Sequence, residues 1–133
     1  IGLNQLEKLW LNQTQVTDDG MQHLENLNKL QRLDLGNTSV GDAGLMQLQN
    51  LTRLKTLALD DTLVSDEGLK VVVTFSELKS LFVVSPNLTS AGLTRLRRLR
   101  MLKKLIVGGP QRRRGGVRYL QSVLPDCRIS LNR

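Results

Sequence analysis

The sequence predicts an α/β solenoid, a right-handed superhelix of short parallel strands and helices, and three observations support this fold class. Gly20, Gly44, Gly68, Gly92 and Gly116 follow one another at intervals of 24 residues, and their surroundings repeat with them. Each unit carries apolar residues with period two and then apolar residues three apart. No unit contains an insertion. Residues 1–133 are therefore predicted to form a single domain of about five 24-residue repeats plus a final strand.

A strand opens each unit because leucines alternate with other residues there. In the first unit Leu9 and Leu11 point inward, so the residues between and beside them line the opposite face of the sheet. Ile129 and Leu131 occupy the same register at the end of the chain. They predict a sixth strand that closes the array.

A helix follows each strand, with Met21, Leu24 and Leu27 forming its apolar stripe in the first unit. Thr17 and Asp18 before this stripe are expected to supply capping oxygens and negative charge at the start of the helix. The apolar positions of one unit cannot offset the entropy of ordering 24 residues, so neighbouring units must stack.

Two prolines interrupt an otherwise regular position between strand and helix. Thr14, Thr38 and Thr62 recur there in the first three units, whereas Pro86 and Pro110 replace them later. Regular packing of these outer turns is therefore open in the last two units.

The run Leu-x-x-Leu-x-Leu-x-x-Thr-x-Val, followed by Thr/Ser-Asp-x-Gly-Leu, resembles the leucine-rich repeat family over the whole chain. It is most similar to the 24-residue bacterial type, and also to the repeats of F-box-type adaptor proteins and of ribonuclease inhibitor. The resemblance implies strands on a concave face and helices on a convex face. Such bacterial arrays are generally taken to bind proteins or to serve as modules of larger chains, and the motif itself does not fix a function.

Charge is distributed unevenly along the chain. Residues 1–67 carry five Lys or Arg against ten Asp or Glu, and residues 68–133 carry fourteen against two. No apolar run approaches 18 residues and no signal peptide is recognisable, so the sequence predicts no membrane span and leaves the compartment unknown. Leu3 falls where Leu27 lies one period later, which leaves open that the chain is a fragment of a longer protein.

Catalytic chemistry is not indicated by any cluster of residues. His23 is the only histidine and is expected on the surface; Cys127 is the only cysteine, and its register places it on the solvent side. No histidine pair, metal-ligand spacing or phosphate-cradling glycine loop occurs. The sequence therefore predicts a non-enzymatic protein with no cofactor, no metal and no small-molecule substrate.

The predicted concave face carries unusually large apolar side chains, which tend to mark interaction sites. We expect a protein partner of unknown identity to bind this face. The residues assigned to it are Trp10, Asp34, Asp60, Phe82, Val84 and Ile106. A neighbouring segment that covers the apolar side chains is the alternative.

The basic C-terminal half suggests a second function, weak binding of a polyanion such as nucleic acid or an acidic surface. The residues assigned to it are Arg97, Arg98, Arg112, Arg113 and Arg114. For the last three, a solvated loop between glycines is the alternative to anion capture. A structural module within a larger protein is the third alternative.

Overall fold

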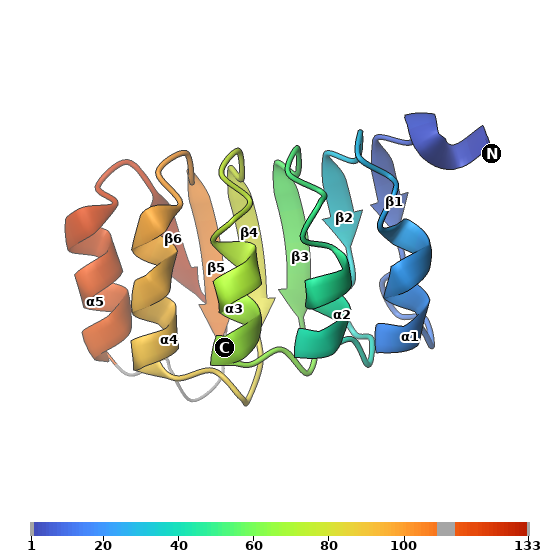
Figure 1. Cartoon of the computed structure of the whole chain (residues 1–133). Helices are drawn as coiled ribbons and strands as arrows, with labels where there is room; N and C mark the ends of the chain where they lie inside the picture. Colours follow the sequence, from blue (N-terminus) through green and yellow to red (C-terminus); the bar gives the residue numbers. More distant parts are fainter. Residues whose placement is uncertain (1, 109–113, 133) are drawn as a thin grey trace.

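The computed structural model describes residues 2–108 and 114–132, and within them it contains one parallel sheet with helices on one of its faces (Figure 1). Each strand pairs with the next strand along the chain, so the sheet order follows the sequence order. The strands are β1 (Lys8–Trp10), β2 (Arg32–Asp34), β3 (Thr56–Asp60), β4 (Ser80–Val84), β5 (Lys104–Gly108) and β6 (Arg128–Leu131). The sixth strand predicted from Ile129 and Leu131 is confirmed.

A helical segment lies between each strand and the next, as the 24-residue period predicts. The α-helices are α1 (Asp18–Met21), α2 (Asp42–Gln47), α3 (Asp66–Val72), α4 (Ser90–Thr94) and α5 (Arg114–Val123). The 3-10 helices are η1 (Gly2–Gln5), η2 (Gln22–Leu24) and η3 (Arg95–Arg98). In Figure 1 these helices cover one face of the sheet and leave the other face open.

The core is a set of leucine columns between sheet and helices. Leu9 pairs in register with Leu33, and the same column continues through Leu57, Leu81, Leu105 and Ile129. The column is fully buried from Leu33 to Leu105. On the helix side the predicted stripe is likewise fully buried in the second unit at Leu45, Leu48 and Leu51. Stacked units thus share one continuous core.

Aspartates at the helix starts join each unit to the next. Asp42, the first residue of α2, accepts a hydrogen bond from the N–H of Ser65 at 2.8 Å and another from the Ser65 hydroxyl at 2.5 Å. Equivalent bonds join Asp18 to the N–H of Gly41 and Asp66 to the N–H and hydroxyl of Thr89. We call Asp18, Asp42 and Asp66 the aspartate ladder.

This ladder differs from the capping expected from the sequence. Thr17 makes no side-chain cap hydrogen bond at the start of α1, and the adjacent Asp18 accepts from the N–H of Gly41 in the following unit. The expected type of cap is present at α3, where the Ser65 hydroxyl accepts from the N–H of Glu67, and also at α4. The sequence therefore identified the residues at the helix starts but not their partners.

The recurring glycines make room for the ladder. A Cβ atom added to Gly68 would collide with the carboxylate of Asp42, and one added to Gly92 would collide with that of Asp66. Ser90 replaces the ladder aspartate in the fourth unit, and there its own backbone lies 3.2 Å from the Cβ position of Gly116. Close approach of successive units thus explains the periodic glycines from Gly44 onward, whereas the space beside Gly20 is open.

The outer turns of the first three units share one hydrogen bond. In the third unit Asp61 adopts a positive φ of 54°, and the buried Thr62 hydroxyl donates to the carbonyl of Leu59 at 2.8 Å. Gln13 with Thr14 and Asn37 with Thr38 repeat this arrangement.

Pro86 changes the turn of the fourth unit, and a different side-chain hydrogen bond holds this turn. A proline pushes the preceding residue toward extended conformations, and Ser85 accordingly lacks the positive φ of its counterparts. Ser85 is fully buried and donates its hydroxyl to the carbonyl of Val64 in the previous unit at 2.6 Å. The turn of the fourth unit is therefore held by a different hydrogen bond. Pro110 lies outside the described residues.

The first unit is less buried than the others. Leu9 and Leu11 are only partly buried, and they line a hollow of about 480 Å³ together with Leu6 and Leu24. A unit at the end of a stack has a neighbour on one side only, which accounts for this difference.

Leu57→Ala should lower the free energy of unfolding by about 2 to 5 kcal/mol, because it removes a fully buried side chain from the middle of the leucine column. Urea unfolding followed by far-UV circular dichroism measures the change. The matched control is Leu63→Ala, since Leu63 is 56% exposed, and we expect it to stay within about 0.5 kcal/mol of wild type. Equal effects of the two substitutions would contradict the column.

Asp42→Ala should cost about 1 to 3 kcal/mol, because it leaves the part-buried N–H of Ser65 without its acceptor. Asp19→Ala is the control, as Asp19 is exposed in the first turn of α1 and carries the same charge. Thermal unfolding of the two variants should separate them by several degrees. A ladder with no structural role would give matching midpoints.

Candidate functional site

The open face of the sheet is lined by the residues that alternate with the buried leucines, as predicted. Its central column runs through paired positions on neighbouring strands. The members are Trp10, Asp34, Ala58, Phe82, Ile106 and Ser130. Since every member is fixed on a strand, the column has a defined geometry.

An apolar patch lies on the C-terminal part of this face. Phe82 on β4 pairs with Ile106 on β5, and Val84 stands two residues beyond Phe82 on the same strand and the same face. All three side chains are half-buried. The ammonium of Lys104 lies 5.2 Å from the centroid of the Phe82 ring, which is cation–π geometry. The patch is therefore apolar in its centre with a cation at its edge.

Trp10 lies apart from this patch, on the N-terminal part of the face. Asp34 and Ala58 separate it from Phe82 in the column. The indole is 54% exposed, and the Arg32 guanidinium lies 5.7 Å from the centroid of the Trp10 ring. The structure thus divides the predicted apolar surface into two anchors.

A hollow of about 220 Å³ lies between the two anchors, and its charged lining residues are Asp34, Asp60 and Arg32. The Asp34 carboxylate accepts a hydrogen bond from the N–H of Gly36 at 3.0 Å. Asp60 extends over Gly36, where a Cβ atom would lie 2.8 Å from its Oδ1. Burial raises the pKa of Asp60; a backbone hydrogen bond opposes the rise, and the charges of Asp34 and Asp61 add to it. Asp34 and Asp60, both assigned to the partner-binding face from the sequence, therefore line the same hollow.

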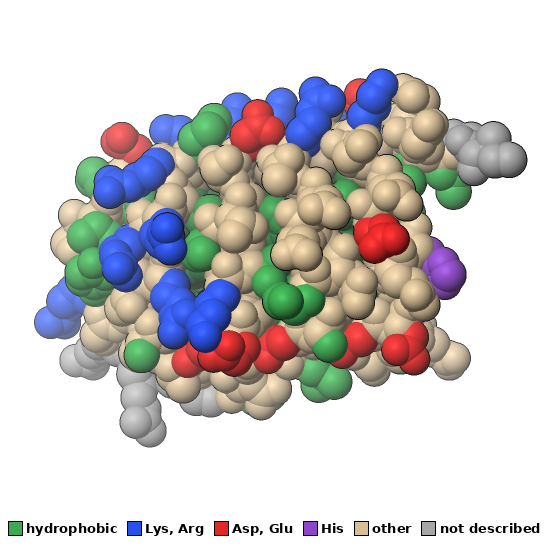
Figure 2. Space-filling view, viewed as in Figure 1, with side chains coloured by type: hydrophobic (Ala, Val, Ile, Leu, Met, Phe, Trp, Pro, Cys, Tyr) green, Lys and Arg blue, Asp and Glu red, His purple; other side chains and the backbone are tan. Residues whose placement is uncertain are grey.

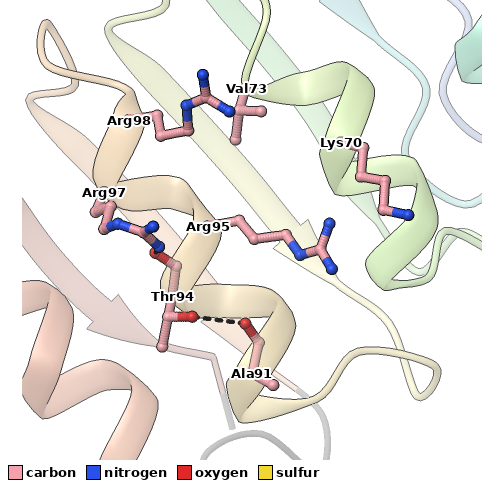
Figure 3. Close-up of a pocket in the computed structure, with 7 residues that line it drawn as sticks. All are labelled: Lys70, Val73, Ala91, Thr94, Arg95, Arg97 and Arg98. Atoms are coloured by element: carbon pink, nitrogen blue, oxygen red, sulfur yellow. Dashed lines mark hydrogen bonds between the residues drawn. The ribbon is translucent and has the colours of Figure 1, made fainter.

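A second surface lies on the helix side. Figure 2 shows Lys and Arg side chains gathered over the C-terminal helices and a row of Asp and Glu along the edge where the N-terminal helices begin. Among the basic side chains is a groove of about 460 Å³ between α3 and α4–η3, drawn in Figure 3. We call it the basic groove. Its lining residues are Lys70, Val73, Ala91, Thr94, Arg95, Arg97 and Arg98.

Only part of the predicted polyanion site can be placed. Arg97 and Arg98 lie on η3 and line the basic groove. Arg112 and Arg113 lie outside the described residues, and Arg114 is the first residue of α5, its side chain being outside the described part. Weak polyanion binding by this half stays a prediction.

Sequence reasoning missed Lys70 and Arg95 as members of the groove. Lys70 lies on α3 and Arg95 on η3, so the two belong to different units. Adding one 24-residue period to Lys70 leads to Thr94, the neighbour of Arg95. Stacking by this period was the available signal that these residues share one groove.

Cys127 does not lie on the solvent side as predicted. It is 9% exposed and packs in the hydrophobic core. Its N–H donates to the carbonyl of Leu124, as that of Leu102 does to Leu99 one unit earlier, so Cys127 takes the position of Leu102 and not of Lys103. Burial raises the pKa of the Cys127 thiol, and the charge of Lys103 lowers it in part.

Three further observations concern the described residues only. His23 is exposed, as predicted. Within residues 2–108 and 114–132, no group of three or more His, Cys, Asp or Glu is placed to hold a metal ion. No helix in the same ranges has the length and apolar character needed to cross a membrane.

Comparison with solved structures shows the leucine-rich repeat fold. The chain is similar to an internalin, InlF, of Listeria monocytogenes (TM-score 0.77, 23% identity, 96% of this chain and 35% of that one). It is also similar to a leucine-rich repeat protein of Leptospira interrogans (TM-score 0.63, 17% identity, 96% of this chain and 38% of that one). No protein-family model and no curated protein sequence matches the chain. The likeness therefore shows the fold, over about a third of the length of these proteins.

Asp60→Asn should stabilise the protein near neutral pH. The pKa of Asp60 is raised in the fold above its ordinary 3.8, so stability falls as the pH rises from that value through the folded pKa. Asparagine does not titrate and removes this loss. We expect a higher urea midpoint at about pH 7 and no gain at about pH 3, where the carboxyl is protonated in both states.

The control for this measurement is Asp19→Asn, which changes the net charge equally at an exposed position of α1. A gain that persists unchanged at about pH 3, or one matched by the control, would contradict the assignment to Asp60.

Proposed function

We propose that this leucine-rich repeat domain is a non-catalytic scaffold that binds a partner protein on the open face of its sheet. The observation that carries the proposal is the pair of apolar anchors on that face. Trp10 is 54% exposed, and Phe82, Val84 and Ile106 form the second anchor. Large aromatic side chains held in fixed positions are the residues that dominate protein–protein binding energy.

The rigidity of the strands supports the proposal. The second anchor lies on β4 and β5, which pair along five consecutive positions. A side chain on a paired strand loses little further freedom on binding, so less of the contact energy is spent on ordering it. An open sheet face therefore suits recognition better than a loop of the same composition.

The polar part of the face suggests the chemistry of the partner contact. Asp34 and Asp60 place two carboxylates in the hollow between the anchors. Arg32 and Lys104 place cations against the Trp10 and Phe82 rings, one at each anchor. A partner that presents apolar side chains to both anchors and a cationic group to the two carboxylates between them would complement this face.

The matched pair Trp10→Ala and Met46→Ala tests the proposal, because both side chains are 54% exposed and Met46 lies on α2, on the helix side. Proteins captured from a native lysate by wild type are identified, purified and titrated against each variant. Trp10→Ala should weaken binding by about 30-fold or more, as loss of an interface hot spot does. Met46→Ala should leave the affinity within about twofold.

Phe82→Ala extends the test to the second anchor and should weaken the same partner. Circular dichroism of each variant checks that the fold is retained. Loss of affinity in Met46→Ala together with unchanged affinity in Trp10→Ala and Phe82→Ala would move the binding surface to the helix side and overturn the proposal.

A further inference from the structure

The basic groove concentrates positive charge between two adjacent units. Lys70 stands on α3, and Arg95 and Arg98 stand on η3 of the next unit. In Figure 3 the Arg95 side chain extends from its helix toward α3, and the Arg98 guanidinium lies toward Val73 at the other end of the groove. Arg95 and Arg98 thus bring cations to the groove from η3, whereas the Lys70 ammonium on the other wall points away from α4 and pairs with Glu67.

Acidic side chains neutralise little of this charge. Within the described residues the one salt bridge joins Lys70 to Glu67 at 2.8 Å, and both side chains are largely exposed. Arg97 donates to the carbonyl of Thr94 at 3.1 Å, which fixes its position but leaves its charge. Neighbouring like charges repel, so a bound anion would stabilise the groove.

Guanidinium groups are suited to phosphate and sulfate. Their planar N–H donors match two oxygens of such a group at once. The uncharged lining residues are Val73, Ala91 and Thr94, and no aromatic side chain lines the groove. A nucleic-acid strand would find no ring on which to stack its bases. A volume of about 460 Å³ fits a compact ligand better than a long one.

We propose that the basic groove binds a compact ligand carrying two or more phosphate or sulfate groups. Four cations against the single carboxylate of Glu67 call for more than one anionic group on the ligand. The groove lies on the helix side of the sheet, so this site is independent of partner binding on the open face.

Isothermal titration with inositol hexakisphosphate and with a sulfated heparin disaccharide tests the proposal at about 150 mM salt, where weak exposed contacts are screened. Wild type should bind at least one probe. The double substitution of Arg95→Gln and Arg98→Gln should weaken that binding by about tenfold or more. The probe that binds more tightly tells whether the ligand carries phosphate or sulfate groups.

Two matched variants separate a site from general charge. Lys29→Gln with Arg53→Gln removes the same net charge from exposed positions before β3 and should leave the affinity within about twofold. Glu67→Gln removes the acidic partner of Lys70 and should strengthen binding. Because the last variant acts in the opposite direction, a loss of fold in the first cannot imitate the expected pattern.

Three results would overturn the proposal. The first is no binding of either probe by wild type at this salt concentration. The second is equal weakening by the groove pair and the control pair, which would indicate net charge alone. The third is binding of duplex DNA that depends on Arg95 and Arg98 and is tighter than the binding of either compact probe.

Discussion

The carboxylate of Asp42 reaches the next unit only because Gly68 has no side chain in its path. This interlock of aspartate and glycine is repeated by Asp18 with Gly44 and by Asp66 with Gly92. It supplies an acceptor to the N–H that begins the following helix, a group that would otherwise lack an intrahelical partner. The spacing of the units, and with it the register of the sheet, depends on this contact.

The interlock also contributes to the difference in charge between the two halves of the molecule. Three ladder aspartates lie in the first half, and Ser90 and Arg114 occupy the equivalent positions in the second. Without the carboxylate, Ser90 lets its own backbone approach Gly116 closely. The acidic edge of the array therefore ends where the basic groove begins, and a single repeated fold presents two surfaces of opposite charge.

The sequence predicted those features that follow from the period itself. Stacking by 24 residues placed Leu33 beneath Leu57 and Phe82 beside Ile106, because each strand repeats at a constant interval. Periodicity does not say which way a polar side chain turns, so the bond from Asp42 to Ser65 across 23 residues could not be predicted. Pattern reading also assigned Cys127 to the column of Lys103, whereas the last turn reaches its strand one residue sooner.

The candidate surfaces show the same limit. Trp10 and Phe82 lie on the open face of the sheet, as the alternation of side chains predicts, yet the cations over their rings come from long side chains whose direction no period determines. The groove of Lys70 and Arg95 needed contact between helices of neighbouring units. Sequence alone predicts which residues share a face, and side-chain packing decides which of them meet.

A bond that always reaches 23 residues ahead has a consequence for how such a chain can change in length. Duplication or loss of a whole 24-residue unit leaves every aspartate opposite a glycine and an N–H, so the new junction is made of parts that already fit. An insertion or deletion of even one residue inside a unit would place a side chain at the glycine position. It would also move the aspartate carboxylate away from the N–H from which it accepts a hydrogen bond. The array can therefore gain or lose complete 24-residue units, because only these changes keep the contacts between neighbouring units.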